Sequence, residues 1–402
     1  MSAPDNPILN SPFEPPKRHW QIDESGAFTQ TTVEQRRRSE HIVPVAATRR
    51  LPRQGLLNLE ESGEGGETLS PNPLVNEIRG HVETWRGLLP TQWGVTHETA
   101  RLLEYWRGAH PQPRLFFCQL EAVETIIWLE EVASRQPQFQ TFREKLKQEN
   151  EGANPGLFRL AAKMATGSGK TTIMAMLIAW QAVNAARGRK SFSDAFLIVC
   201  PGITIRDRLR VLLPSDPESY YESRGLLPDD MIGDVRKARV VITNYHAFKL
   251  RETLSLPKFA RAVLQGRGKG PQTQESEGQM RARVCPELLS RKNVIVISDE
   301  AHHCYQRKPG ASEESKLQAE DRAEAKENEE AARLWINGIK ALDRKVGVSL
   351  IVPVTQRRKA TVPMKLSHRL FQEFFTARYV SKNAHPSDGL PVSVRNLLAE
   401  MS

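Results

Sequence analysis

Residues 164–172, with the sequence MATGSGKTT, have the types and spacing of a loop that binds the phosphate chain of a nucleotide. Gly167 and Gly169 allow positive φ angles, which turn backbone N–H groups toward a phosphate. The helix predicted to begin here adds its N-terminal dipole and N–H donors. Lys170 would reach the β- and γ-phosphates of ATP, and the Thr171 hydroxyl would bind Mg²⁺. The other members of the predicted cradle are Thr166, Ser168 and Thr172.

The strict form of this loop begins with glycine, whereas this chain has Met164. The departure weakens a match by pattern alone but leaves every phosphate-contacting position in place. The alternative is a chance GSGKT in an ordinary loop. An apolar run before the loop and the helical run IMAMLIAWQAV after it favour the nucleotide site.

A second motif, VIVISDEAHH at residues 294–303, is an apolar strand that ends in acidic residues. Asp299 would hold Mg²⁺ directly or through water, and Glu300 would orient and deprotonate an attacking water. His302 would couple the ATP site to neighbouring elements. An acidic turn that only caps a strand is the alternative.

The elements around these motifs alternate between short apolar strands and helices, which is typical of a parallel α/β sheet. Ligands of such sheets lie at the carboxyl ends of the strands, so Lys170 and Asp299 are expected to share one crevice. The predicted strands are Leu157–Lys163, Ala195–Cys200, Arg239–Thr243, Asn293–Ser298 and Gly347–Val352.

Composition excludes several classes of protein. The 402 residues are 39% hydrophobic and 26% charged, and no apolar run is long enough for a membrane helix. Four scattered cysteines and the absence of a signal-peptide pattern predict a reduced, cytoplasmic protein. A net charge of +10 makes a polyanion a plausible partner.

The chain divides by composition into three predicted regions. Residues 1–75 are a proline-rich basic arm, with one short hairpin around Trp20, Ile22 and Phe28. Residues 76–351 hold two entry helices, near 76–89 and 120–132, and then the nucleotide-binding lobe. Within the lobe, residues 265–283 are predicted to be a mobile insert and residues 313–330 a solvated helix or lid. Residues 352–402 are a tail.

The two nucleotide motifs, in this order, resemble the first RecA-like lobe of superfamily 2 helicases in the DEAH-box form. Residues 115–131 resemble the upstream glutamine motif of restriction-type translocases, in which Gln119 would read the adenine edge. Taken alone, Gln119 is more often an ordinary polar residue on a helix. The resemblance also implies contacts with a nucleic-acid backbone from Thr204, Arg206, Arg208, Thr243 and Asn244. Ordinary strand ends and a solvated basic helix are the alternative for these five.

The N-terminal PILNSPFEPPKRHW, the segment at 115–131 and the stretch CPGITIRDRLRVLLP at 200–214 resemble the restriction subunit of type III-like restriction endonucleases. The resemblance covers roughly residues 7–351. It implies coupling of ATP hydrolysis to movement along duplex DNA, cleavage by a separate C-terminal nuclease domain, and a modification methyltransferase subunit as a partner.

Some expected elements are missing from the sequence. GVSLI at 347–351 resembles the entry to a Ser-Ala-Thr element, but the element itself does not follow. No second lobe with its arginine finger and no nuclease carboxylates follow either. The run Pro228-Asp229-Asp230, with Lys237 nearby, lacks the strand that a nuclease site needs. A frameshift or truncation after about Ile351 is therefore expected, with an unusual accessory tail as the alternative.

Three functions compete on this evidence. The first is an ATP-dependent DNA translocase of a restriction endonuclease, which makes the chain a hydrolase at family level. The second is an isolated lobe that binds ATP and DNA with little turnover. The third is a DEAH-class RNA helicase, which the flanking stretches fit less well.

Overall fold

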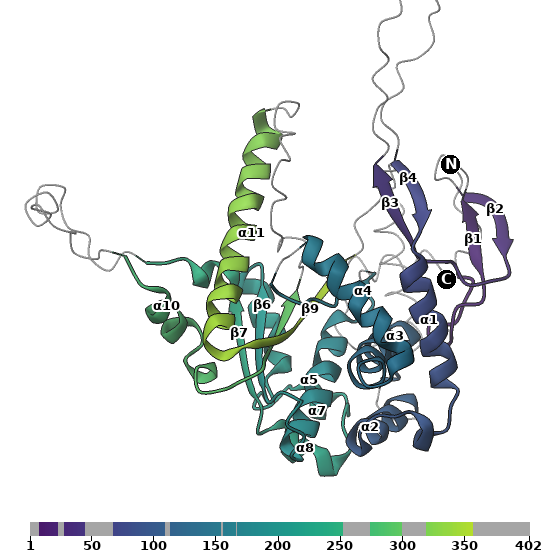
Figure 1. Ribbon diagram of the computed structural model, residues 1–402, viewed down its shortest axis with the longest axis horizontal. Helices are drawn as coiled ribbons and strands as arrows, with labels where there is room; N and C mark the ends of the chain where they lie inside the picture. Colours follow the sequence, from purple (N-terminus) through teal and green to yellow (C-terminus); the bar gives the residue numbers. More distant parts are fainter. Residues whose placement is uncertain are drawn as a thin grey trace, which may run out of the picture. The chain divides into compact units, whose positions relative to one another are not determined.

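The computed structural model describes residues 8–22, 28–44, 67–108, 113–153, 156–165, 167–251, 274–299 and 319–356 (Figure 1). Thr166, Glu300 and His302 lie outside these residues, as does the predicted tail from residue 357 onward. The chain divides into two compact units, and the described part of the first falls within Met1–Glu83. The second unit, Thr84–Arg357, holds the parallel sheet and the candidate site.

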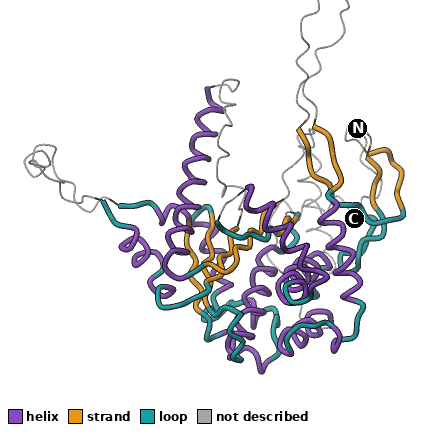
Figure 2. The backbone as a smooth tube through the Cα atoms, in the orientation of Figure 1, coloured by secondary structure: helices purple, strands orange, loops and turns teal. Residues whose placement is uncertain are grey.

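The first unit contains two antiparallel hairpins, whose strands are orange in Figure 2. Strands β1 (His19–Ile22) and β2 (Phe28–Val33) confirm the predicted hairpin. Strands β3 (Glu40–Pro44) and β4 (Glu67–Pro71) form a second hairpin that was not predicted. Its strands are far apart in the chain, so no short turn signal marks the pair. The predicted irregular arm thus contains two small sheets.

Five helical segments, besides a 3₁₀ turn at Pro90–Gln92, occupy residues 73–153, and they confirm both predicted entry helices. They are α1 (Pro73–Arg86), α2 (His97–Arg107), α3 (Phe117–Ile127), a π-helical segment (Trp128–Ala133) and α4 (Pro137–Ala153). The π segment continues α3 directly and is buried at five of its six residues.

The second unit is built on a five-stranded parallel sheet, which confirms the predicted α/β, RecA-like fold. The strand order is β5-β9-β8-β6-β7, so β9 separates the strand before the phosphate loop from the strand before Asp299. The strands are β5 (Ala162–Met164), β6 (Ala195–Cys200), β7 (Arg239–Asn244), β8 (Val294–Asp299) and β9 (Val348–Gln356).

Strand β5 is shorter than the predicted Leu157–Lys163, and Pro353 explains the difference. An isolated parallel bridge joins Arg159 to Ile351, and the ladder resumes only at Ala162, opposite Val354. The next bridge in this register would need an N–H from Pro353, which proline lacks. The pairing is therefore interrupted, and β5 is only three residues long.

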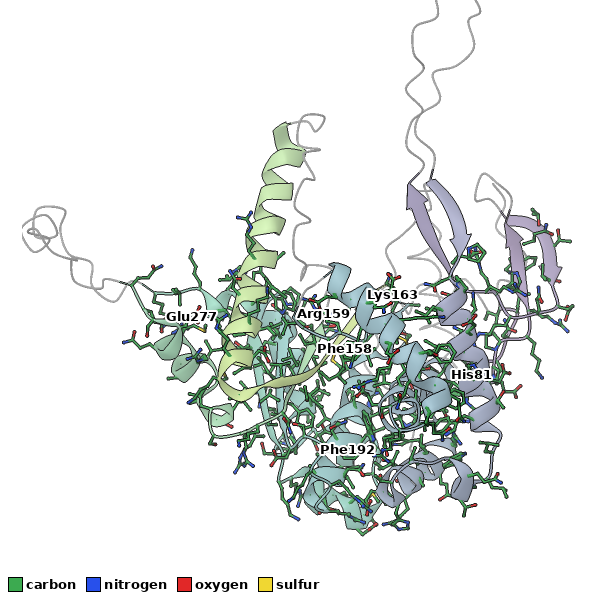
Figure 3. All side chains as sticks on the ribbon, viewed as in Figure 1. His81, Phe158, Arg159, Lys163, Phe192 and Glu277 are labelled. Atoms are coloured by element: carbon green, nitrogen blue, oxygen red, sulfur yellow. The ribbon has the colours of Figure 1, made fainter. Side chains whose placement is uncertain are left out.

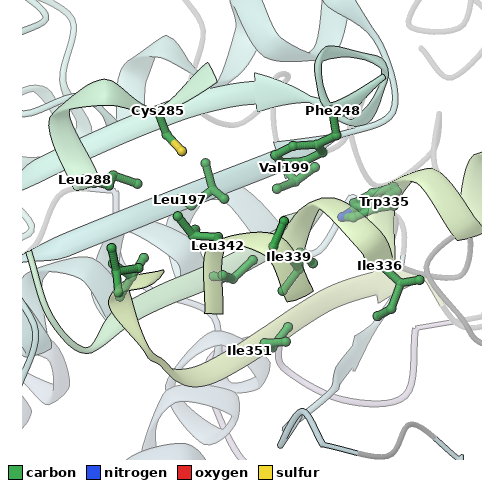
Figure 4. Packing of buried hydrophobic residues seen from close by; sticks show 14 of the residues in the cluster. Leu197, Val199, Phe248, Cys285, Leu288, Trp335, Ile336, Ile339, Leu342 and Ile351 are labelled. Atoms are coloured by element: carbon green, nitrogen blue, oxygen red, sulfur yellow. The ribbon is translucent and has the colours of Figure 1, made fainter. Parts of the chain in front are cut away.

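Two helices cover the sheet. Helix α11 (Ala319–Val346) covers one face, where its buried side chains meet alternate residues of β6 and β8 (Figure 4). Helix α5 (Lys170–Ala186) contributes nothing to that cluster, is almost entirely buried, and contacts β9. Because side chains alternate along a strand, we place α5 on the opposite face. The main members of the α11 cluster are Leu197, Val199, Val294, Val296, Trp335, Ile339 and Leu342.

Three predicted boundaries need correction. Residues 277–283 of the predicted mobile insert form most of α10 (Glu277–Val284), which begins at a Ser276 cap. Burial of Met280 and the hydrogen bonds of Arg283 to two backbone carbonyls hold this helix in place. The predicted tail begins inside β9, which runs on to Gln356. The predicted 313–330 helix is only the first part of α11, whose later turns belong to the core.

Short helices complete the described part of the second unit. They are α6 (Ile203–Arg208), α7 (Tyr220–Ser223) and α8 (Asp229–Val235), with 3₁₀ turns at Leu209–Leu212, Tyr245–Phe248 and Pro286–Leu288. None of the helices in the described part of the chain is both long and apolar enough to cross a membrane.

Candidate nucleotide-binding site

The carboxyl ends of all five strands lie at one edge of the sheet, because the strands are parallel. The phosphate loop follows β5 at this edge, and Asp299 ends β8. Asp299 is in register with Val354, which is in register with Ala162. Two strand spacings, about 10 Å, therefore separate Asp299 from the strand that leads into the loop.

The phosphate loop has the backbone that its sequence predicts. Gly167 has a φ of 78° and Gly169 a φ of 77°, both in the left-handed region. Helix α5 begins immediately afterwards at Lys170, so the positive end of its dipole lies at the loop. The Ser168 hydroxyl donates to the Ala165 carbonyl at 2.6 Å, which closes the loop. The arrangement is a cradle of backbone donors at a helix N-terminus.

Gln119 lies against this loop and is 5% exposed. Its Oε1 accepts from the Phe116 N–H at 2.9 Å, and its Nε2 donates to the Ser168 carbonyl at 3.0 Å. A Cβ on Gly169 would overlap Nε2, so a larger residue here would have to displace the buried Gln119 amide and would also be strained by the positive φ. The side chain thus ties the start of α3 to the phosphate loop, and reading of adenine by Gln119 stays a prediction.

Asp299 is 9% exposed and lies on the same face of the sheet as α5. Its strand alternates, with Val294 and Val296 facing α11, so Ile295, Ile297 and Asp299 face the other way. Carboxylate and hydroxyl oxygens are the ligands that Mg²⁺ prefers, and the Thr171 hydroxyl is at the start of α5. The two predicted ligands therefore suit Mg²⁺ in their chemistry. Among the described residues, no group of three or more His, Cys, Asp or Glu could hold a metal.

Thr172 makes a contact that sequence reasoning missed. It is 2% exposed, and its Oγ1 accepts from Nη1 of Arg224 at 3.3 Å. The Arg224 guanidinium carbon lies 3.9 Å from the ring centroid of Tyr220, and Nη2 donates to the Tyr220 hydroxyl at 3.0 Å. The only signal in the sequence is a four-residue spacing of Tyr and Arg, which on its own indicates no site.

A buried polar network anchors the other end of α5. Glu131, which is 1% exposed, accepts from the Thr96 N–H, the Thr99 hydroxyl and the Trp180 indole N–H at 2.7–2.9 Å. Asn184 joins the network through the hydroxyls of both threonines. The network ties α2 and the π segment to α5, and so fixes the helix that carries Lys170.

The predicted nucleic-acid residues lie on α6, which follows β6, and at the end of the adjacent strand β7. Thr204 and Arg208 are exposed on α6, and Arg206 is half-buried beside Asp207. Thr243 is only 7% exposed, and the Asn244 side chain caps the following turn by accepting from the Ala247 N–H. Structural roles therefore account for Thr243 and Asn244, while all five contacts stay predictions.

The rejected nuclease-like run forms ion pairs instead. Asp230 lies in the first turn of α8, where it accepts from Arg101 and Arg187 at 2.9–3.0 Å. Hydrogen bonds from Arg101 and then Arg187 hold the pKa of this carboxyl far below its ordinary value. Asp234 is paired with Arg187 and Lys237. These two carboxylates therefore have cationic partners in the structure.

Comparison with family models places one match on this chain, to the type III restriction enzyme res subunit, over residues 114–334. The matched region contains Gln119, the phosphate loop, α5 and Asp299. Comparison with curated proteins and with solved structures gave no significant match. Since the matched region spans more than half of the chain, this protein belongs to the family of type III restriction enzyme res subunits, a family of helicase-like restriction enzyme subunits.

Proposed function

We propose that this chain is the ATP-binding motor lobe of a DNA translocase of a restriction system, and that it binds Mg-ATP at the phosphate loop. One observation carries the proposal. The positive-φ glycines and the start of α5 form a phosphate cradle at the sheet edge where Asp299 also lies, on the face that α5 covers. Family membership supports the same function.

Each residue of the proposed site has a defined task. The backbone N–H groups of the loop and the ammonium of Lys170 neutralise the phosphate oxygens, and Thr171 and Asp299 hold the Mg²⁺. Glu300 directly follows the Mg²⁺ ligand, and it orients and deprotonates the water that attacks the γ-phosphate. Gln119 reads the adenine edge with the hydrogen-bonding capacity that its contacts to Phe116 and Ser168 leave over.

Duplex DNA is the proposed polyanion. The segments that follow β6 and β7 begin at the same sheet edge as the proposed nucleotide site. Thr204 and Arg208 are exposed there, and the whole chain carries a charge of +10. Backbone contacts of this kind give binding that is independent of sequence and falls steeply with salt. A modification methyltransferase subunit is a proposed partner, on family grounds alone.

A second candidate is an ATP- and DNA-binding lobe with little turnover. Within the described residues there is one parallel sheet and one phosphate loop, and no second lobe faces it. In related NTPases an arginine that reaches the γ-phosphate accelerates turnover about 10³–10⁵-fold. Without such an arginine, ATP would bind but hydrolyse slowly, and DNA would stimulate hydrolysis little.

Steady-state ATPase activity of the purified chain, measured alone, with duplex DNA and with RNA, tests the proposal. DNA-stimulated turnover of several per second supports a working motor, whereas binding with slow, unstimulated turnover supports the second candidate. Stimulation by RNA alone points to an RNA helicase. Glu300→Gln is the matched control, because it keeps the shape of the side chain and ATP binding while it removes the base. A Gln variant with the parent rate would exclude Glu300 from the mechanism.

A further inference from the structure

Arg224 lies beside the proposed nucleotide site, and no sequence motif marks it. It is half-buried just after α7, with its guanidinium over the Tyr220 ring and Nη1 at 3.3 Å from the Thr172 hydroxyl oxygen. Two of its five N–H donors are used in these hydrogen bonds. The ring and the hydroxyl fix the direction in which the guanidinium points.

Three other arginines of this lobe have carboxylate partners, whereas Arg224 forms no ion pair with any residue that the structure describes. Arg187 pairs with Asp230 and Asp234, Arg210 with Asp216, and Arg236 with Glu222. A half-buried cation without a counter-charge is costly, and a bound anion removes that cost. A guanidinium presents several donors in one plane, which suits the oxygens of a phosphate.

The position of Thr172 indicates which phosphate is involved. Thr172 comes directly after Thr171 on α5, and its side chain borders Gly169 on the side where Gln119 lies. A Cβ on Gly169 would overlap Gln119 Nε2 and would be 3.6 Å from Thr172 Oγ1. In the proposed function, Lys170 and Thr171 act on the β- and γ-phosphates and Gln119 acts on the base. Arg224 therefore lies toward the phosphate between them.

We infer that Arg224 binds the α-phosphate of the nucleotide, with Tyr220 as the positioning residue that holds its guanidinium flat. The inference rests on the proposed function, since it concerns the same nucleotide. It adds a phosphate contact from outside the phosphate loop, and so makes the short segment after α7 part of the site. Because the α-phosphate is common to all nucleotides, Arg224 contributes equally to triphosphates and diphosphates and to different bases.

The test is equilibrium binding of Mg-ATP, Mg-ADP and Mg-ITP to the full chain and its Arg224→Met variant, by titration calorimetry and competition. Methionine keeps an unbranched apolar stem and removes the charge. We expect affinity to fall about tenfold, and by the same factor for all three ligands. Arg224→Lys, which keeps the charge, should recover part of the loss. Arg236→Met removes an exposed, ion-paired arginine and serves as the matched control, with unchanged affinity.

Other outcomes would overturn the inference. Unchanged affinity in Arg224→Met removes Arg224 from the site. A loss of affinity for Mg-ATP but not for Mg-ADP would assign Arg224 to the γ-phosphate. A loss of affinity for Mg-ATP and Mg-ADP but not for Mg-ITP would assign it to the base. Failure of the parent chain to bind any nucleotide contradicts the proposed function itself.

A second variant covers the case in which Arg224→Met unfolds the segment after α7. Tyr220→Phe keeps the ring under the guanidinium and removes only the 3.0 Å hydrogen bond. We expect about a threefold loss of affinity for all three ligands, without a change in the thermal unfolding of the nucleotide-free chain. A lower unfolding temperature with full affinity would assign both residues a structural role only.

Discussion

The two ends of α5 are held by different kinds of contact. At the start, Gly169, Lys170 and Thr171 are half-buried, Gln119 donates to the Ser168 carbonyl, and Arg224 donates to the Thr172 hydroxyl. At the end, Trp180 and Asn184 are fully buried and hydrogen-bonded to Glu131 or its neighbours. Phe192, labelled in Figure 3, packs edge-on against Trp180 at this end of the helix, with 5.8 Å between the ring centroids.

The contrast predicts that the start of α5 serves ligand binding and that its end serves the stability of the fold. In the proposed function, the start provides the backbone donors and the ammonium that bind the phosphates. The polar groups at the end are satisfied within the protein, so removing one leaves buried partners unpaired. Substitutions at the start should therefore change ligand affinity, and substitutions at the end should change the free energy of unfolding.

Lys170→Ala should have the largest effect, the loss of measurable Mg-ATP binding. One ammonium offsets several phosphate charges in this cradle, and alanine supplies no replacement. Titration calorimetry with Mg-ATP measures the affinity, and urea unfolding of the nucleotide-free variant should match that of the parent. Equal ATP affinity in variant and parent would remove this loop from nucleotide binding and break the contrast between the two ends.

Glu131→Ala should lower the stability of the fold and leave Mg-ATP binding nearly unchanged. Its removal leaves the Thr96 N–H, the Thr99 hydroxyl and the Trp180 indole without their acceptor, which should lower the free energy of unfolding by about 3 kcal/mol. Urea unfolding measures the change. The folded variant should bind Mg-ATP within about twofold of the parent. A tenfold loss of affinity would instead show that the network sets the geometry of the phosphate loop.

Asp230→Ala should have the smallest effect, at most about 1 kcal/mol, although Asp230 also bridges two arginines. Its side chain is 52% exposed, so water screens both ion pairs. The arginines lower the pKa of Asp230 in the folded protein, so its contribution is present above the ordinary value of 3.8 and is lost as the pH falls below that value.

Urea unfolding of parent and Asp230→Ala at pH 7 and in acid measures this contribution. The difference between the two proteins should shrink as the pH falls below about 4. The free energies of unfolding of parent and Asp230→Ala could instead differ by about 3 kcal/mol at pH 7, as expected for Glu131→Ala. Solvent exposure would then not explain the difference in stability between the Glu131 network and the Asp230 ion pairs.

The start of α5 could be predicted from the sequence and the end could not. GSGKTT encodes a local conformation and a local chemistry, so the glycine φ angles and the first residue of the helix follow from neighbouring residues. Thr96, Glu131 and Asn184 are distant in the chain and individually ordinary. Their meeting depends on how α2, the π segment and α5 pack, which no local pattern records.

The same distinction explains the boundaries that were wrong. The pattern of apolar residues predicted five parallel strands, and all five are present. The length of each strand depends on the strand that it pairs with. Pro353, on β9, interrupts the pairing between β9 and the segment that leads into β5. Residues 277–283 read as part of a polar insert, yet they form a helix because Arg283 and Met280 have partners elsewhere in the lobe.

The sequence by itself determined the α/β class, the phosphate loop, the acidic strand end and the resemblance to restriction subunits, because each depends on residues close together in the chain. Only the tertiary structure decided the strand order, the face on which Asp299 lies, the contact of Gln119 with Ser168 and the position of Arg224 beside Thr172. These features join segments that are many residues apart. Packing brings such segments together by burying apolar surface. This driving force is non-directional and does not depend on separation in the sequence, so no local pattern of residues records which segments will meet.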